Sequence, residues 1–386
     1  MRELLNLFAE TESRDEIGIG QVRDAFSDLL FPGTSTLHTR AKYLLIVPWC
    51  YREAEQRHLR GGQLASRVEA NERRVIKTLK DAGELDGLIG RVAGVAVKTL
   101  PSTIYWGALG QYRIRLSDEP GNGLGRQIAR EADELDERAD GDWAATLPAV
   151  PSGFPGHIDD GLDLTAIEAA WLRDRMRLGA PDSLLAHLLR EKHRPHEASW
   201  APWDDAATEE APAQVTQDLS HAELFSLAVH GASLLYNLLI AERYERANLT
   251  AIDEPVAAYR EALDEWHDET ADVRWVGWDR ALMWETVISR NPRIATNIRL
   301  RAFVDTWLDA IASGAVTRAA QNQSLRGLVA DRERSVKRAQ SRLINDRLLR
   351  TWSGGSGTRR LTFRWTQVRR LLLDVHNGVE ADIATS

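Results

Sequence analysis

The sequence predicts a mainly α-helical protein, an irregular bundle of many helices with at most a few short strands. Three observations lead to this fold class. Apolar residues recur every three or four positions in one segment after another. Ser, Thr, Asp, Pro and Gly stand where these periodic segments begin and end. Only Leu361–Trp365 has the composition of a strand.

Residues 1–116 are predicted to form an N-terminal helical domain. A helix is expected over Gln21–Leu30, and a second over Leu37–Ile46 that kinks or restarts at Pro48, because proline has no N–H to donate. Gly61-Gly62 would end it, and a charged helix would follow over residues 63–82. The pattern of helix, turn and helix also occurs in DNA-reading motifs, but this one carries few cations.

Residues 117–218 are predicted to form an acidic, loop-rich connection with short helices. Between residues 131 and 218 there are 20 Asp or Glu against seven Lys or Arg. Short helices are expected near residues 164–178 and 182–190. Residues 198–218 are rich in Ala, Pro and acids, which is typical of an exposed, mobile linker.

Residues 219–386 are predicted to form a C-terminal helical domain with a basic helix. Ser220-His221-Ala222-Glu223 has the pattern of a capping box, and it would open a long, leucine-rich, buried helix. The basic helix is expected over Gln323–Thr351, followed by a flexible loop at Ser353–Gly357. A closing helix would begin near Thr366 and end at Gly378.

Tryptophan is abundant, with 13 residues, and five of them lie between Trp266 and Trp307. Because aromatic side chains bury large areas, the favoured interpretation is a Trp-rich core, and a platform for stacking bases is the alternative. The single cysteine, Cys50, lies in an apolar setting and indicates a packed thiol. His230 lies on the predicted long helix, with Ser233, Tyr236 and Asn237 nearby, and indicates a buried polar network.

Charge is distributed very unevenly along the chain. The net charge is −8, yet residues 318–370 hold 14 Lys or Arg against three acids. Such a block on an acidic protein favours binding to a polyanion, although pairing with acidic residues of the same chain or of a second copy remains open. The loop at Ser353–Gly357 could add backbone N–H groups for a phosphate. The predicted nucleic-acid-binding residues are Arg334, Lys337, Arg338, Arg342, Arg347, Arg350, Arg359, Arg360 and Arg364.

No motif in the sequence predicts a catalytic residue, a cofactor or a metal site. His187, His193 and His196 do not have the spacing of metal ligands on a helix. Four acids cluster near the N-terminus and could serve a divergent metal-dependent nuclease, but their spacing is equally that of helix capping and solubility. They are Asp15, Glu16, Asp24 and Asp28.

Several motifs resemble those of an uncharacterised bacterial family, a domain of unknown function. The N-terminal motifs are Arg14-Asp15-Glu16-Ile17-Gly18-Ile19-Gly20, Val22-Arg23-Asp24-Ala25-Phe26-Ser27-Asp28, Leu30-Phe31-Pro32-Gly33-Thr34-Ser35-Thr36 and Thr39-Arg40-Ala41-Lys42-Tyr43. The C-terminal motifs are Trp352-Ser353-Gly354-Gly355-Ser356-Gly357 and Phe363-Arg364-Trp365. The resemblance implies no reaction, and it implies accessory proteins of mobile or defence gene clusters.

These observations lead to one main functional hypothesis. The protein is expected to be a non-catalytic, nucleic-acid-associated component of a bacterial antiviral or DNA-processing complex. The first alternative is an assembly subunit whose basic face docks an acidic surface of a protein partner or of a homo-oligomer, and the second is the divergent nuclease. The longest apolar run, Leu44–Tyr51, is interrupted by Pro48, so we expect a cytoplasmic protein without a membrane partner.

Overall fold

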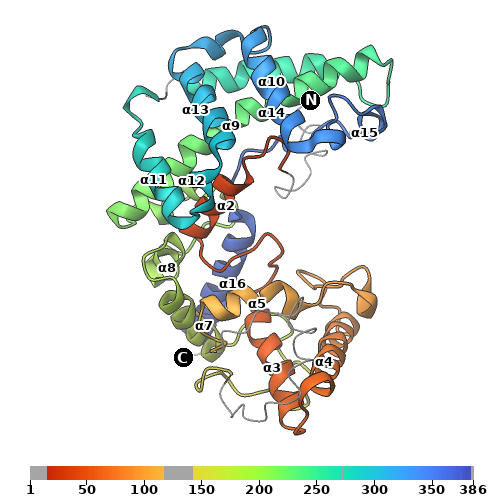
Figure 1. Cartoon of the computed structure of the whole chain (residues 1–386). Helices are drawn as coiled ribbons and strands as arrows, with labels where there is room; N and C mark the ends of the chain where they lie inside the picture. Colours follow the sequence, from red (N-terminus) through yellow and green to blue (C-terminus); the bar gives the residue numbers. More distant parts are fainter. Residues whose placement is uncertain (1–14, 117–141, 272, 274, 384–386) are drawn as a thin grey trace. The chain divides into compact units, whose positions relative to one another are not determined.

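The computed structural model describes residues 15–116, 142–271, 273 and 275–383. Within these ranges the chain forms 14 α-helices and several short 3₁₀ helices but no strand (Figure 1), which confirms the mainly α-helical fold class. The strand considered at Leu361–Trp365 is wrong, because Phe363 and Arg364 adopt positive φ angles of 54° and 69°, outside the extended region. Arg14 and the first part of the predicted connection, 117–141, lie outside the described residues.

The chain packs into two compact units, and each combines two separated stretches of sequence. Unit 1 consists of residues 1–29 and 217–363, and unit 2 of residues 30–216 and 364–386. The predicted division at 116/117 and 218/219 follows chain order instead and stays a prediction about domains. The helices of unit 1 are α2 (Gly20–Leu30), α9 (Ala213–Arg246), α10 (Pro255–Ala271), α11 (Arg280–Arg290), α12 (Arg293–Thr296), α13 (Ile298–Ala312), α14 (Gln323–Lys337) and α15 (Asp346–Arg350).

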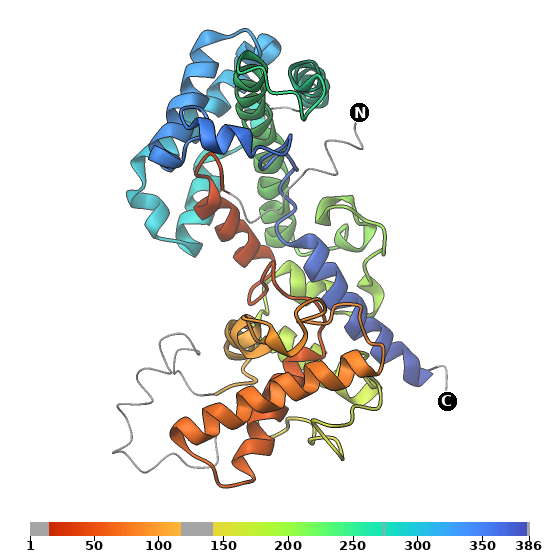
Figure 2. The same cartoon turned by 90° about the vertical axis from the view of Figure 1, so that its right-hand side faces the viewer.

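The core of unit 1 is built around α9, the long green helix in Figures 1 and 2. The indole N–H of Trp266 on α10 donates to the Leu227 carbonyl of α9, and that of Trp307 on α13 donates to the Ala228 carbonyl, both at 2.8 Å. The two indole rings stack with centroids 6.0 Å apart. These contacts confirm the Trp-rich core for this pair, since both rings are fully buried.

The start of α9 differs from the sequence prediction. The helix begins at Ala213, so Ser220 lies inside it and caps nothing. By length and composition α9 could cross a bilayer, yet 78% of its most apolar window is buried within the protein. Buried apolar surface of this kind is what a core helix provides.

Replacing Gly231 with alanine is expected to destabilise unit 1 by about 1–3 kcal/mol through overpacking. A Cβ at Gly231 would lie 2.3 Å from the Trp266 ring, which is itself held by its bond to Leu227. Gly327→Ala in α14 is the matched control, because a Cβ there meets nothing within 4 Å. That control should gain up to about 1 kcal/mol from helix propensity. Urea unfolding of both variants measures the difference, and equal stabilities would contradict this packing.

Unit 2 contains six helices among the described residues. They are α3 (Tyr43–Glu55), α4 (Gly61–Asp81), α5 (Pro101–Gln111), α7 (Ala166–Gly179), α8 (Leu184–Leu188) and α16 (Trp365–Ile383). The predicted helix over Leu37–Ile46 is displaced, because α3 begins at Tyr43 and continues through Pro48 to Glu55. Gly61 therefore begins α4 rather than ending α3. The charged helix predicted over residues 63–82 is confirmed.

Helices α7 and α16, the latter the blue helix that leads to the C-terminus in Figure 2, pack closely. Gly378 allows this approach, since a Cβ there would lie 2.6 Å from Cβ of Ala169 and 2.9 Å from the Leu164 carbonyl oxygen. The prediction that Gly378 ends the helix is wrong, because α16 continues to Ile383.

The segment predicted as an exposed linker, 198–218, is folded into unit 2 up to the start of α9. Asp205 is buried and accepts hydrogen bonds from the Ser199 hydroxyl at 2.6 Å and from the Ala207 N–H at 3.0 Å. Ser199 in turn accepts a bond from the Trp365 indole at 3.2 Å. Asp205 therefore caps a turn inside the fold. Composition alone cannot tell such a buried acid from one that is exposed to solvent.

Candidate nucleic-acid interface

The basic segment of unit 1 does not form one continuous helix. Helix α14 ends at Lys337, and Arg338 adopts a φ of 51° at the start of a 3₁₀ turn. The cause lies in Glu333, whose buried carboxylate accepts hydrogen bonds from the Ser341 hydroxyl and, at 3.0 Å, from the Arg342 N–H. These bonds turn the chain back onto α14. The single basic helix expected over Gln323–Thr351 is therefore wrong, and Arg334, Arg338 and Arg342 do not share one helix.

Two of the predicted cations are neutralised by the N-terminal segment of the same unit. Lys337 and Arg342 form ion pairs with Glu16, at 3.2 Å and 3.0 Å. Burial acts to lower the pKa of Arg342, but Glu16 and Tyr236 outweigh it and the pKa is raised. Both side chains therefore hold Glu16 within unit 1, and its carboxylate offsets part of the charge that they would present to a phosphate.

A neighbouring arginine fixes the same N-terminal segment. The Arg332 guanidinium donates to the carbonyl oxygens of Ile17, at 2.9 Å, and Gly18, at 2.6 Å. A Cβ on Gly18 would lie 2.6 Å from this guanidinium, and its φ of 69° favours glycine. The motif around Gly18 thus holds the chain against α14.

Three other predicted cations remain at the surface of unit 1. Arg338, Arg347 and Arg350 are exposed, and no acid among the described residues forms an ion pair with them. Asn345 links their elements, because its side chain donates to the Ala339 carbonyl at 2.9 Å and caps α15 through the Arg347 N–H at 3.1 Å. We refer to Arg338, Arg347 and Arg350 as the arginine face.

The remaining predicted cations have more varied surroundings. Arg334 is half exposed and pairs with Asp331 at 3.4 Å, an exposed pair of little energetic value. Arg359 is exposed, and Arg360 pairs with Glu269 at 3.6 Å while burial lowers its pKa. Arg364 belongs to unit 2, where it donates to the Thr34 carbonyl at 2.7 Å.

The Ser353–Gly357 loop is buried and does not offer its backbone to a phosphate. Asn237 accepts the Ser356 N–H at 2.9 Å and donates to the Ser356 carbonyl at 2.8 Å. The Tyr259 hydroxyl donates to the Gly354 carbonyl at 2.5 Å. His230 bonds the Thr358 carbonyl at 3.1 Å, so the predicted polar network on α9 is confirmed and serves to hold this loop.

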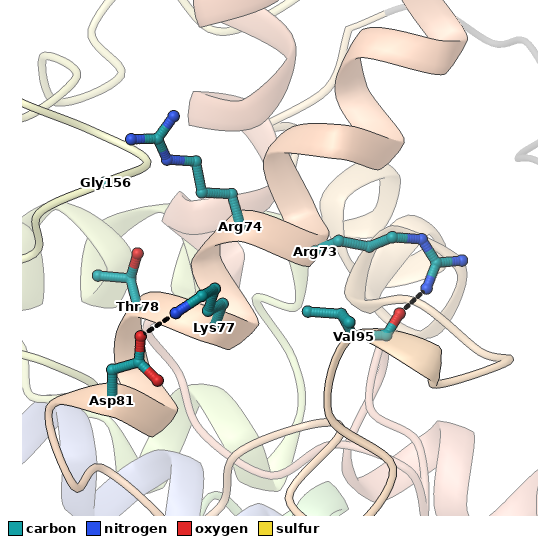
Figure 3. A pocket seen from close by; sticks show the side chains of 7 residues that line it. All are labelled: Arg73, Arg74, Lys77, Thr78, Asp81, Val95 and Gly156. Atoms are coloured by element: carbon teal, nitrogen blue, oxygen red, sulfur yellow. Dashed lines mark hydrogen bonds and ion pairs between the residues drawn. The ribbon is translucent and has the colours of Figure 1, made fainter.

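Unit 2 holds a second group of cations, which sequence reasoning missed. Arg73, Arg74 and Lys77 of α4 line a hollow of about 450 Å³, together with Thr78, Asp81, Val95 and Gly156 (Figure 3). The helical spacing of the α4 residues was readable in the sequence. Val95 and Gly156, which complete the wall, come from distant parts of the chain and gave no signal.

A family model described as a family of unknown function, DUF6361, matches residues 1–378 of the chain. The chain belongs to DUF6361. The match confirms the resemblance to an uncharacterised family and assigns no reaction. No curated protein and no solved structure matches the chain.

Three of the four acids considered for a nuclease in this DUF6361 member contact different residues. Glu16 pairs with Lys337 and Arg342. Asp15 accepts the N–H groups of Ile19 and Gly20, at 2.7 Å and 2.8 Å, and so caps the start of α2. Asp24 pairs with Arg23 at 2.9 Å. Within the described part of the chain, no group of three His, Cys, Asp or Glu is arranged to hold a metal ion.

The histidines and the cysteine of this DUF6361 chain occupy structural positions. The rings of His187 and His193 lie 4.0 Å apart, but His187 bonds the Ala207 carbonyl at 3.0 Å and the Nδ1 atom of His196 accepts the Ala198 N–H at 3.2 Å. Burial raises the pKa of the Cys50 thiol well above its usual value. The packed, unreactive thiol predicted for Cys50 agrees with this environment.

Proposed function

We propose that this DUF6361 protein binds nucleic acid through the arginine face of unit 1, as a non-catalytic component of an antiviral or DNA-processing assembly. The observation that supports the proposal is the exposure of Arg338, Arg347 and Arg350 without an acid partner among the described residues. Arginine is well suited to phosphate because its planar guanidinium can donate two parallel hydrogen bonds. Contacts of this kind release counterions and give affinity without reading sequence.

Fluorescence anisotropy with labelled single- and double-stranded DNA and RNA tests the proposal, over about 50–300 mM salt. The triple variant Arg338→Glu, Arg347→Glu, Arg350→Glu is expected to lose binding at the upper end of this range. For duplex DNA, the slope of the logarithm of the binding constant against the logarithm of the salt concentration should become less steep by about three, roughly one for each lost phosphate contact.

The matched control changes three other exposed arginines of unit 1, Arg290, Arg293 and Arg299, to glutamate. This control carries the same change of net charge and should bind nearly as tightly as the wild type. Equal loss in both triple variants would show non-specific attraction to exposed arginines of unit 1 and contradict the arginine face. Absence of binding by the wild type at the lowest salt would reject the proposal.

The alternative, docking of an acidic protein surface, uses the same residues and gains support from Glu16. The pairs that Glu16 forms with Lys337 and Arg342 show that this basic segment already accepts a carboxylate of its own chain. That alternative predicts stoichiometric protein complexes in light scattering and no affinity for oligonucleotides. The nuclease alternative predicts cleavage of the same probes that depends on Mg²⁺ or Mn²⁺.

A further inference from the structure

We propose that the hollow on α4 of unit 2 is a binding site for a small phosphorylated ligand. The site is independent of the arginine face, which belongs to unit 1. Its volume, about 450 Å³, is that of a site for a small molecule or for a short part of a larger one. None of the seven residues that line it is assigned to the nucleic-acid interface.

The walls of the hollow are held in place by hydrogen bonds to α4. The Thr78 hydroxyl donates to the Pro155 carbonyl at 2.9 Å, which fixes the loop that carries Gly156. On the other side, Arg73 donates to the Val95 carbonyl (Figure 3). The hollow therefore lies between a helix and two anchored loops, and its shape does not depend on a ligand.

Arg74 is the cation best placed to receive an anion. It is exposed, and no acid among the described residues pairs with it. Its guanidinium lies against Gly156, where a Cβ would be only 2.8 Å from Nη2. The absence of a side chain at Gly156 thus leaves room for the guanidinium in this position, with N–H donors still unused.

The other two cations of the hollow each pair with an acid. Lys77 bonds Asp81 and keeps further N–H donors of its ammonium group, while Arg73 bonds Glu69 at 2.8 Å as well as Val95. Asp81 offsets the charge of Lys77 and Glu69 offsets that of Arg73, so the net positive charge of the hollow is that of Arg74. An anionic ligand is therefore attracted mainly to the Arg74 side.

The directions of the side chains place the phosphate at Arg74. Figure 3 shows Arg73 and Arg74 pointing away from each other, with Lys77 between them. Arg73 is turned toward the Val95 carbonyl, so a phosphate bound to Arg74 has Lys77 as its nearer second cation. The seven lining residues include no aromatic side chain on which a base could stack, so the phosphate itself would carry recognition.

Titration calorimetry of the full-length protein with inorganic pyrophosphate at low salt tests the site. Arg74→Gln is expected to weaken pyrophosphate binding by about tenfold or more, as for loss of a charge-assisted hydrogen bond. Arg177→Gln, the same change at an exposed arginine of α7 in unit 2, should change the affinity less than twofold. Circular dichroism at 222 nm should show both variants folded, because both side chains are exposed.

Competition experiments identify the source of the phosphate. Displacement of pyrophosphate by ATP would indicate a free nucleotide, and displacement by a 5′-diphosphorylated oligonucleotide but not by its 5′-hydroxyl counterpart would indicate a nucleic-acid end. The triple variant of the arginine face should bind pyrophosphate normally, which keeps this test separate from the proposed function. Absence of pyrophosphate binding, or equal weakening in Arg74→Gln and Arg177→Gln, would overturn the proposal.

Discussion

Replacing Arg40 by methionine is expected to destabilise unit 2 by about 3–5 kcal/mol, because it leaves a buried carboxylate without its partner. Arg40 and Asp374 are each about nine-tenths buried, and the Arg40 Nε atom lies 3.0 Å from both carboxylate oxygens. Arg40 also contacts Asp163, at 2.5 Å. Among the ion pairs in the described part of unit 2, the pair of Arg40 and Asp374 joins the residues that lie farthest apart in sequence.

The pKa of Asp374 explains the size of this effect. Burial raises the pKa of Asp374 above its ordinary value, even though Arg40 and the Ala41 N–H act to lower it. Without Arg40, only the Ala41 N–H and the more distant Arg370 oppose the effect of burial, so the carboxylate must either stay charged at high cost or take up a proton. The destabilisation of Arg40→Met should therefore shrink as pH falls.

Urea unfolding followed by circular dichroism measures the loss, and hydrogen exchange of α16 peptides locates it in unit 2. Arg194→Met is the matched control, because Arg194 pairs near the surface with Glu380 of α16, the helix that also carries Asp374. Loss of this pair should cost about 1 kcal/mol or less. Adding Asp374→Asn to Arg40→Met should restore part of the stability, because the stranded charge is removed. A loss below about 1 kcal/mol in Arg40→Met would contradict the predicted effect of a buried ion pair.

Local signals allowed several elements of the fold to be predicted from sequence. The sequence predicts that Asp279 caps a short helix and that Gly314 ends the helix near Thr296–Ala312. In the structure Asp279 caps α11 by accepting the Leu282 N–H at 2.9 Å, and Gly314 ends α13 with a φ of 73°. These predictions succeed because capping depends on a side chain and its own neighbours in sequence. Apolar spacing likewise identified the buried α9, although its start was placed at Ser220.

The predictions that failed depend on contacts that apolar spacing and composition do not reveal. Nothing near Arg338 indicates that α14 ends at Lys337, because the cause is the bonding of Ser341 and Arg342 to Glu333. The basic residues were found from composition alone, but composition cannot separate an exposed Arg347 from an Arg342 that Glu16 neutralises. The hollow on α4 was missed for the same reason, since Gly156 carries no charge and no motif.

Acidification from pH 6.5 toward pH 4 is expected to destabilise both units through two histidines held neutral in the fold. Burial lowers the pKa of His38 to about 4, and burial with the nearby Arg360 lowers that of His230 to about 4. Each ring bonds a backbone carbonyl through Nε2, and each Nδ1 is buried without a partner. Protonation would place a charge and an unpaired N–H on Nδ1, which the fold does not stabilise.

The sign of the effect follows from proton binding. Below about pH 6.5 the unfolded chain protonates each histidine, whereas the folded chain stays neutral until about pH 4. Stability is thus complete above pH 6.5 and falls as the pH drops, by roughly 1.4 kcal/mol per pH unit for each histidine. Urea unfolding at pH 7, 6 and 5 should show this slope. The variant His38→Phe, which keeps an aromatic ring against Tyr105, should lose the part that belongs to His38. His187 and His376 of unit 2, whose pKa values burial also lowers, would keep their own contribution.

The variant His230→Leu should lose the corresponding part in unit 1, and hydrogen exchange at each pH assigns the change to one unit or the other. His157→Gln, at a histidine that is 68% exposed, should keep the full wild-type slope. A flat profile between pH 7 and pH 5 in the wild type would contradict the neutral state of both rings. The double variant His38→Phe, His230→Leu should show a weaker dependence of the unfolding free energy on pH than the wild type. An unchanged dependence would assign the acid sensitivity to groups other than these two histidines.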